Sequence, residues 1–297
     1  MFVIKFKKLF VGISVTLVIL SLASVLFFGL KMGIDFKGGS SLDLVYQSAR
    51  PELIDIKSEL SNAGYGDASV QPAGETGIII KSRDLTEIER AEVVSLVSIK
   101  GQNQVEQKSF TNIGPSVGKE LRKKAIASII LVLIGIILFV AYAFRKVSRP
   151  VSSWKYGFVV IVALIHDIII PTGVFALLGH LYGFEVDTLF IVALLTTLGL
   201  SVADTIVVFD RIRENLSNKI SKPFSELVGE SLSQTFGRSI NTSLVVLLMV
   251  LSLVFFGPQS TKLFATVLAI GMFFGTYSSI FLASPLLVLV EKYQKRS

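Results

Sequence analysis

Six long apolar stretches divide this sequence, and polar or charged segments separate them. The first stretch, 9–30, has about 22 residues, which is enough to cross a bilayer as a helix at a rise of about 1.5 Å per residue. The other stretches, in chain order, are 125–144, 156–179, 188–209, 240–257 and 263–290. The last is longer than one crossing requires, so we expect it to tilt or to break near Pro285. The pattern predicts a polytopic α-helical membrane protein with six transmembrane helices.

The polar segment 31–124 has a different pattern, which predicts a small α+β domain. Alternating apolar and polar positions predict strands, at 41–47, 68–72, 77–81 and 104–110. Helical spacing predicts two helices, at 51–63 and 86–97, and Thr86 and Glu89 have the spacing of a capping box at the start of the second. The order βαββαβ within about 70 residues is typical of a ferredoxin-like domain.

Composition agrees with a membrane protein and narrows the classes of function. Hydrophobic residues make up 52% of the chain and charged residues 17%, with a mean hydropathy of +0.68. The chain has no cysteine, which excludes disulfides, thiolate metal sites and a cysteine nucleophile. It has two histidines, His166 and His180, which is little material for a histidine metal site.

Motifs for energy-yielding catalysis are missing from the sequence. It contains no Walker-type phosphate loop, no Gly-x-Ser-x-Gly and no His-Glu-x-x-His. We therefore expect neither an enzyme nor a bound cofactor or metal. Any work done by this protein has to draw on an ion gradient or on the ATPase of a partner.

The net charge of +7 follows the membrane segments and does not form a nucleic-acid-binding face. Basic residues gather in alternate connecting segments, at Arg145, Lys146, Arg149 and Lys155, at Arg211, Arg213, Lys219, Lys222 and Arg238, and at Lys292, Lys295 and Arg296. Because cytoplasmic loops carry the excess of Lys and Arg, both termini are predicted to be cytoplasmic and the domain external. A basic cluster at 119–124 falls on the external side, at the end of a loop longer than about 60 residues, where this rule weakens.

These predictions divide the chain into four parts. They are an N-terminal cytoplasmic segment with the first span (1–30), the external α+β domain (31–124), a bundle of the other five spans (125–290) and a cytoplasmic tail (291–297). Within the bundle, the cytoplasmic loop 210–238 is predicted to form an amphipathic helix or a helix pair, with Pro223 starting the second helix.

Asp204 is an acid inside the fourth apolar stretch, roughly 7–8 Å from its cytoplasmic end. A carboxylate inside a spanning helix costs on the order of 2.5–3.5 kcal/mol unless it faces protein or water. Ser201 lies on the same helix face, and small residues nearby favour close packing against another helix. Asp204 is either a buried carboxylate that fastens two helices or a titrating group on a proton path.

Two further polar groups lie in the predicted spans. Arg238 is followed one turn later by Asn241 and Thr242, and this stripe either offers a counter-charge to an acid or anchors the helix at the lipid headgroups. His166 and Asp167 lie near the middle of the third span, about 15 Å from either end. That pair serves either structural hydrogen bonding or a proton relay.

Several ordered motifs resemble one family across essentially the whole chain. They are GIDFKGGS at 33–40, IGPSVGKEL at 113–121, His166–Asp167, SVADTIVVFDRIREN at 201–215 and RSINTS at 238–243. This set resembles the SecF family of protein-export membrane proteins. Lys37 stands where that family usually has Thr, and Ala203 stands where Asn or Ser often precedes the aspartate.

The resemblance implies a fold and a set of partners. SecF pairs with SecD, each with six spans, in an assembly similar to the RND transporters of the cytoplasmic membrane. The implied partners are SecD, the SecYEG channel, YidC and the translocating polypeptide, and the implied energy source is the proton motive force. Asp204 and Arg238 match the positions that take part in proton transport in that family. The alternatives are a structural subunit of the Sec assembly and an RND-type exporter of small molecules or lipids.

The same resemblance marks the connectors between the domain and the membrane. Its signature residues there are Gly33, Asp35, Gly38, Gly39, Gly114 and Pro115. Gly38 and Gly39 supply the permissive backbone that a hinge requires, and a tight turn is the alternative.

Overall fold

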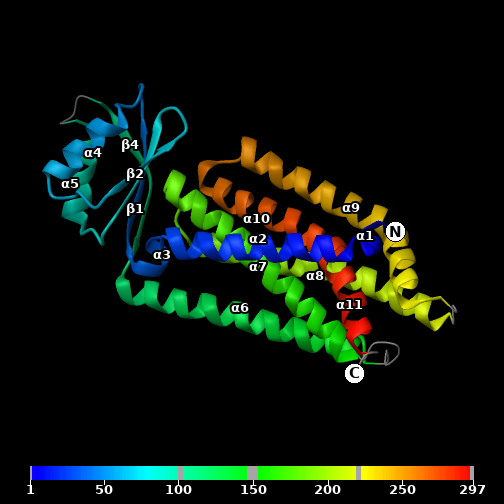
Figure 1. Cartoon of the computed structure of the whole chain (residues 1–297). Coiled ribbons are helices and arrows are strands. Elements are labelled where there is room, and N and C mark those ends of the chain that lie inside the picture. Colours follow the sequence, from blue (N-terminus) through cyan, green and yellow to red (C-terminus); the bar gives the residue numbers. More distant parts are fainter. Residues whose placement is uncertain (1, 100–102, 146–152, 219–221, 295–297) are drawn as a thin grey trace. The chain divides into compact units, whose positions relative to one another are not determined.

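The computed structural model describes residues 2–99, 103–145, 153–218 and 222–294. The chain separates into two compact units (Figure 1). The small unit comprises Met32–Ile126 together with Glu185–Thr188, and the larger unit comprises Met1–Lys31, Ala127–Phe184 and Leu189–Ser297. The short segment Glu185–Thr188 thus belongs with the small unit although it lies far along the chain.

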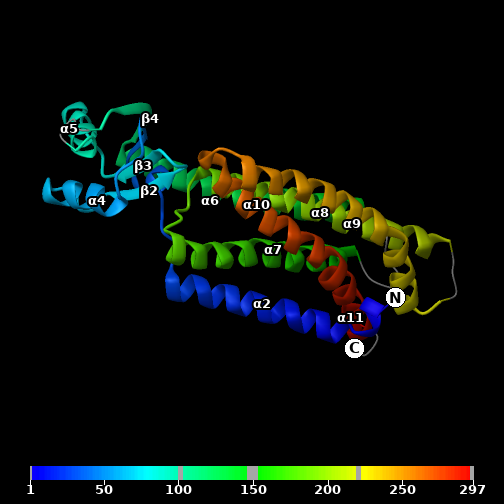
Figure 2. The ribbon, with the colours of Figure 1, turned by 90° about the horizontal axis from the view of Figure 1, so that it is seen from above.

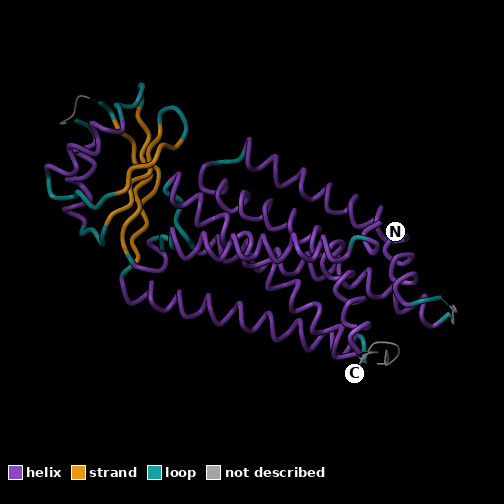
Figure 3. Tube along the Cα trace, viewed as in Figure 1, coloured by secondary structure: helices purple, strands orange, loops and turns teal. Residues whose placement is uncertain are grey.

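The small unit is built on one antiparallel sheet with strand order β2-β3-β1-β4. Its strands are β1 (Gly39–Tyr46), β2 (Ser69–Ala73), β3 (Gly77–Ser82) and β4 (Val105–Ile113). Helices α4 (Leu53–Asn62) and α5 (Glu87–Val97) lie on one side of this sheet (Figures 1 and 3). The βαββαβ order with β1 and β3 at the centre is the ferredoxin-like arrangement, which confirms the predicted α+β domain.

The core of the small unit follows from the alternation in its strands. Leu42, Leu44 and Tyr46 point to the buried side of β1, and Ile78 and Ile80 do the same on β3. They pack against apolar residues of both helices, namely Ile56, Leu60, Val93 and Val97. The Tyr46 hydroxyl donates a hydrogen bond to the carbonyl oxygen of Val97 at 3.0 Å, so the largest core side chain also satisfies its polar atom.

The predicted capping box at the start of α5 is present. The Glu89 N–H donates to Thr86 Oγ1 at 3.4 Å, and the Thr86 N–H donates to Glu89 Oε2 at 2.8 Å. Arg83 Nη2 also lies 2.6 Å from Glu89 Oε1. The hydrogen bond from Arg83, followed by those from Thr86, lowers the pKa of Glu89 to about 2.

Six helices among the described residues are long and apolar enough to cross a membrane, which confirms that part of the prediction, and each lies wholly or mainly in the larger unit. The helices are α2 (Lys7–Phe28), α6 (Pro115–Ala143), α7 (Ser153–Tyr182), α8 (Thr188–Ser217), α9 (Phe224–Phe256) and the last span, built from α10 (Gln259–Tyr277), η1 (Ser278–Ala283) and α11 (Ser284–Gln294). A short helix, α1 (Phe2–Lys5), precedes them. Figure 2 shows these helices from a second direction.

The spans differ in the share of each that is buried inside the structure. In α7 and in the last span 56% of the most apolar window is buried, against 17% in α9, 11% in α2 and 6% in α6. The first two therefore form the centre of the bundle, and the others present apolar side chains outward, as expected for contact with lipid or with another membrane chain. The rings of Phe144, directly after α6, Tyr156 of α7 and Phe209 of α8 pack against one another.

The last span contains a π-helix, η1, directly before Pro285. Proline has no N–H, and its ring clashes with the carbonyl four residues earlier, which here is Phe281. The wider turn of a π-helix is one way to accommodate this clash. The irregularity expected near Pro285 is thus a change of helix type within one long span.

The predicted cytoplasmic loop 210–238 is mostly continuous with its neighbouring helices. The helix α8 extends to Ser217, and α9 begins after Pro223, its N-cap residue, as predicted for the second helix. Residues 219–221 of this loop lie outside the described residues, as do 295–297 of the tail. Asn215 Nδ2 donates to Ser231 Oγ at 2.8 Å and to Gln234 Oε1 at 3.1 Å, which joins the two helices.

Substituting Thr86→Ala should raise hydrogen exchange in the first turn of α5 in the intact protein, because loss of an N-cap destabilises a helix by about 1 kcal/mol. The pKa of Glu89 is lowered in the folded protein. The stability that ionised Glu89 contributes is therefore fully present above about pH 4.5 and is lost as the pH falls through about 2. Hydrogen-exchange mass spectrometry of the first turn of α5 measures the effect of Thr86→Ala. Unchanged exchange in α5, with Thr111→Ala on β4 as the control, would contradict the capping role.

Candidate functional site

Asp167 in α7 lies at the centre of a polar cluster inside the bundle. Its side chain is fully buried. Ser201 Oγ of α8 donates to Asp167 Oδ2, and Ser278 Oγ, the first residue of η1, donates to the same oxygen at 2.9 Å. His166 Nδ1 lies 2.9 Å from Asp167 Oδ1 and donates to it when the ring carries its proton there. One carboxylate therefore joins α7, α8 and η1.

Hydroxyl groups extend this cluster along α8 and η1. Thr205 Oγ1 and Ser279 Oγ are 3.0 Å apart, and the Ser279 hydroxyl donates to the carbonyl oxygen of Ser201 at 3.3 Å. Both side chains are buried. Hydrogen bonds to a buried carboxylate stabilise its charge, and the same carboxylate accepts a proton when its surroundings change. The cluster can therefore hold either a charge or a proton.

His166 has one ring nitrogen in the cluster and one outside it. Among the described residues its buried Nε2 atom has no hydrogen-bond partner. The ring lies nearly parallel to that of Tyr277, with centroids 6.2 Å apart. When the ring proton is on Nδ1 and directed toward Asp167, Nε2 is the acceptor nitrogen of the ring.

Two glycines of α10 allow it to approach α8 beside this cluster. A Cβ atom on Gly271 would lie 2.3 Å from Thr197 Oγ1, and one on Gly275 would lie 3.1 Å from the Cβ of Ser201. The spacing Gly-x-x-x-Gly is that of close helix contacts in membranes. These glycines bring the last span close enough for Ser278 to reach Asp167.

Asp204 lies one turn after Ser201 on α8, half-buried, and contacts α9. The Ser243 hydroxyl donates to Asp204 Oδ2 at 3.0 Å. Arg238 is near enough for an electrostatic interaction with Asp204, but no ion pair within 4.0 Å joins them. Arg238 lies about four turns into the continuous helix α9, which begins well before the apolar stretch 240–257.

The stripe of Arg238, Asn241 and Thr242 lies on the exposed face of α9. The structure thus brings Asp204 to Ser243, with Arg238 within electrostatic range, and Ser201 to His166–Asp167; Asn241 and Thr242 lie outside both groups. Residues that the sequence reasoning did not single out are Ser243, Ser278, Ser279 and Thr205. Ser243 and Thr205 had a signal, because they belong to the motifs RSINTS and SVADTIVVFDRIREN, whereas Ser278 and Ser279 belong to no motif.

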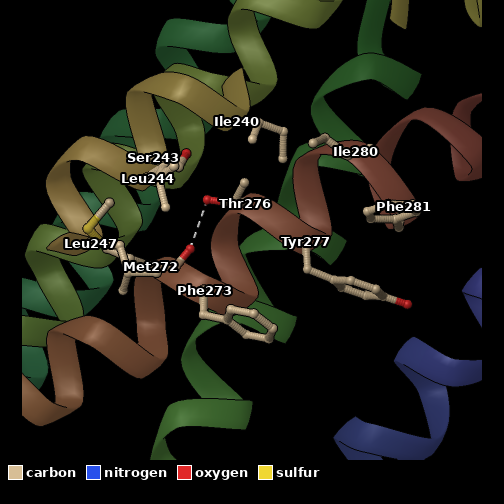
Figure 4. A pocket seen from close by; sticks show the side chains of 10 residues that line it. All are labelled: Ile240, Ser243, Leu244, Leu247, Met272, Phe273, Thr276, Tyr277, Ile280 and Phe281. Atoms are coloured by element: carbon tan, nitrogen blue, oxygen red, sulfur yellow. Dashed lines mark hydrogen bonds between the residues drawn. The ribbon is translucent and has the colours of Figure 1, made fainter. Parts of the chain in front are cut away.

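A cavity of about 220 Å³ lies between α9 and the α10–η1 helix, next to Ser243 (Figure 4). Its lining is mostly apolar, with Ile240, Leu244 and Phe273 among the side chains around it. The Thr276 hydroxyl at its edge already donates a hydrogen bond to the carbonyl oxygen of Met272 at 2.9 Å. The cavity therefore suits apolar groups better than ions.

The signature GIDFKGG forms a second candidate site, inside the small unit. It contains a one-turn helix, α3 (Ile34–Lys37), which the sequence did not predict. The Gly33 N–H donates to the carbonyl oxygen of Val186 at 2.8 Å, and Asp35 Oδ2 accepts from the Thr188 N–H at 2.8 Å. The signature therefore binds the segment Glu185–Thr188, which no motif had marked.

The other signature residues are placed by close contact. Gly38 and Gly39 have φ of 84° and 136°, and a Cβ atom on Gly38 would lie 2.9 Å from the Cα of Pro115. One on Gly39 would lie 2.4 Å from the carbonyl oxygen of Ser82. Gly114 precedes Pro115, the first residue of α6. Both connectors thus meet in the small unit, and the first one is tightly packed.

Comparison with known proteins identifies relatives along most of the chain. The family described as "Protein export membrane protein SecD/SecF, C-terminal" matches residues 93–293, and the "SecD/SecF GG Motif" matches residues 23–49. A protein translocase subunit SecF from Thermobaculum terrenum is 40% identical, with 97% of this chain and 93% of that protein covered. SecF from Anaerolinea thermophila is 36% identical, with 98% and 94% covered.

Solved structures agree with these relatives. A crystal structure of SecDF, a translocon-associated membrane protein from Thermus thermophilus, is 31% identical with a TM-score of 0.85. It aligns with 98% of this chain, which spans 38% of that longer protein. A SecDF structure in a super-membrane-facing form has a TM-score of 0.70. Protein translocase subunit SecDF of Brucella abortus is 32% identical, and 93% of this chain aligns with 35% of that protein.

Substituting Gly271→Ala should separate α10 from α8 and destabilise the purified protein by about 1–3 kcal/mol, because the new methyl group would overlap Thr197. The midpoint of thermal unfolding in detergent measures this. Gly199→Ala on α8 is the matched control, because a Cβ atom there meets nothing within 4 Å. Equal midpoints for the two variants would show that the close approach is not required.

Proposed function

This chain belongs to the SecD/SecF family of protein-export membrane proteins, and on that premise we propose that it is a SecF-type translocase subunit driven by the proton motive force. In this proposal it pairs with SecD, acts with the SecYEG channel and YidC, and helps to move unfolded polypeptides across the cytoplasmic membrane. Both termini lie in the cytoplasm and the small unit lies outside. The coupling ion is H⁺, and no cofactor takes part.

The observation that carries this proposal is the pair of polar sites on α8. Ser201 belongs to the Asp167 cluster, and Asp204, one turn later, contacts Ser243 of α9. Carboxylates within spanning helices are rare, and they mark ion or proton pathways more often than other functions. A translocase without a nucleotide-binding motif needs another energy source, and a proton-binding carboxylate is the group through which a proton gradient acts.

Protonation of Asp204 changes the contact between α8 and α9. The neutral carboxyl loses its attraction to Arg238, and it gains a donor that competes with the hydrogen bond from Ser243. The two protonation states therefore favour different contacts between the helices. A ligand, here the proton, shifts a conformational equilibrium only through such a difference.

The exposed stripe of α9 fits a site that a second chain completes. Arg238, Asn241 and Thr242 are polar groups on a face that is otherwise apolar, and α9 is one of the least buried spans. Polar groups within a membrane are stabilised by packing against polar groups of another helix. We infer that spans of SecD cover this face and supply partners for Arg238. The SecDF proteins among the relatives, which carry a longer chain, support this inference.

A second candidate, a structural subunit without its own proton transport, has one observation in its favour. Asp167 makes hydrogen bonds to three side chains and so holds three helices together, which a purely structural carboxylate would also do. The two candidates differ at Asp204. An exporter of small molecules is not supported, because the relatives are named as protein translocase subunits.

The variant Asp204→Asn should assemble with SecD but lose the stimulation of export by a proton gradient, because an amide keeps the acceptor for Ser243 and cannot be protonated. The measurement is polypeptide export by membrane vesicles with and without an imposed gradient. Asp210→Asn, at an exposed acid of the same helix paired with Arg213, is the control and should respond normally. A normal response of Asp204→Asn would leave the structural candidate standing.

Arg238→Lys should reduce the gradient-driven export although the charge is kept, because a planar guanidinium and an ammonium group make different contacts. The same vesicle assay measures it. Arg211→Lys, at a partly exposed arginine paired with Glu214 on α8, is the control. Full export with lysine at 238 would indicate that this residue only anchors α9 at the membrane surface.

A further inference from the structure

The first turn of α8 is held by a residue of the signature motif, far away in the sequence. Thr188 is the first residue of α8, and its N–H is one of the four that a helix leaves without an internal partner. Asp35 Oδ2 accepts this N–H at 2.8 Å across 153 positions of the chain. A carboxylate at this end also interacts favourably with the helix dipole. Asp35 therefore caps α8 from the connector that follows α2.

Three other contacts hold the segment Glu185–Thr188, which ends at the first residue of α8. Val186 accepts a backbone hydrogen bond from Gly33 at 2.8 Å and forms a β-bridge with Met32. Glu185 Oε2 lies 3.0 Å from Lys81 Nζ of β3. A Cβ atom on Gly33 would lie only 3.1 Å from the Val186 carbonyl oxygen, so the absence of a side chain there permits the contact. The segment is thus bound at three of its four residues.

The backbone around Asp35 is closely packed. Ile34 and Phe36, on either side of it in α3, are buried. Gly38 packs against Pro115, and Gly118 packs in turn against Gly38, where a Cβ atom would lie 2.8 Å from the Gly38 nitrogen. The close contacts leave little room for a hinge at this point. This packing holds the Asp35 carboxylate in position to accept the N–H of Thr188 at the start of α8.

From these contacts we propose that Asp35 is a positioning residue that makes the first turn of α8 part of the small unit. A movement of α8 would then be delivered to that unit at Thr188. The helix carries Ser201 and Asp204 about 20 and 24 Å from Thr188, at 1.5 Å per residue. The proposal rests on the proposed function, in which protonation of Asp204 moves α8. It assigns to the signature motif the transmission of that movement to the small unit.

A set of variants at Asp35 tests the cap in the intact protein. Asp35→Ala removes the acceptor, whereas Asp35→Asn keeps an acceptor oxygen and should rescue most of the effect. We expect faster hydrogen exchange at the first turn of α8, and a reduced response of export to a proton gradient, in Asp35→Ala but not in Asp35→Asn. Asp67→Ala, at an exposed acid of the same unit, is the control and should change neither.

Two results would overturn the proposal. One is unchanged exchange at α8 in Asp35→Ala. The other is faster exchange with normal gradient-driven export, which would make the cap structural only. Neither result bears on Asp204→Asn. If Asp204→Asn responds normally to the gradient, the proposed function fails, whatever the exchange at α8 shows.

A crosslink provides the complementary test, because the chain has no cysteine of its own. Met32 and Val186 are partners in a parallel β-bridge. Neighbouring strands lie about 5 Å apart, which is within the Cα–Cα range of a disulfide. The double variant Met32→Cys/Val186→Cys should form a disulfide readily and keep gradient-driven export, since the two segments move together. Failure to form the disulfide, or loss of export that reduction restores, would show that the segments separate during the cycle.

Discussion

A carboxylate buried inside a membrane bundle needs hydrogen-bond donors, and the arrangement of the central helices depends on how Asp167 obtains them. Its donors come from its neighbour His166, from Ser201 of α8 and from Ser278 of η1. Removing those donors would leave an unpaired charge in a medium that solvates charge poorly. The three helices that supply them are accordingly held at one level of the bundle.

Close packing is the condition for those hydrogen bonds. Serine hydroxyls are short, so Ser278 reaches Asp167 only where the last span lies directly against α7 and α8. Gly271 and Gly275 make that approach possible on the α8 side, and the π-helix that begins at Ser278 sets the direction of its side chain. The π-helix and the two glycines thus together allow the hydrogen bond from Ser278 to Asp167.

The helix α8 carries buried polar contacts in the bundle and begins in the small unit. Along its length lie the cap by Asp35 at Thr188, the Asp167 cluster at Ser201 and the contact of Asp204 with Ser243. An α-helix keeps its internal hydrogen bonds when it shifts, so these three sites cannot move independently along its axis. The glycine-rich signature is accordingly a packing motif as much as a turn, since Gly33 and Gly38 both allow close backbone contacts.

The sequence by itself determined the elements whose signals are local. The six spans, the βαββαβ order and the Thr86–Glu89 capping box follow from apolar run length, alternation and short-range spacing, and all three are present. It also marked Asp204 and His166–Asp167 as unusual, because a charge inside an apolar run is visible without a structure. Only the tertiary structure decided their partners. Ser278 lies 111 positions from Asp167 and Thr188 lies 153 positions from Asp35. Such contacts depend on which helix faces meet, and no local pattern encodes that pairing.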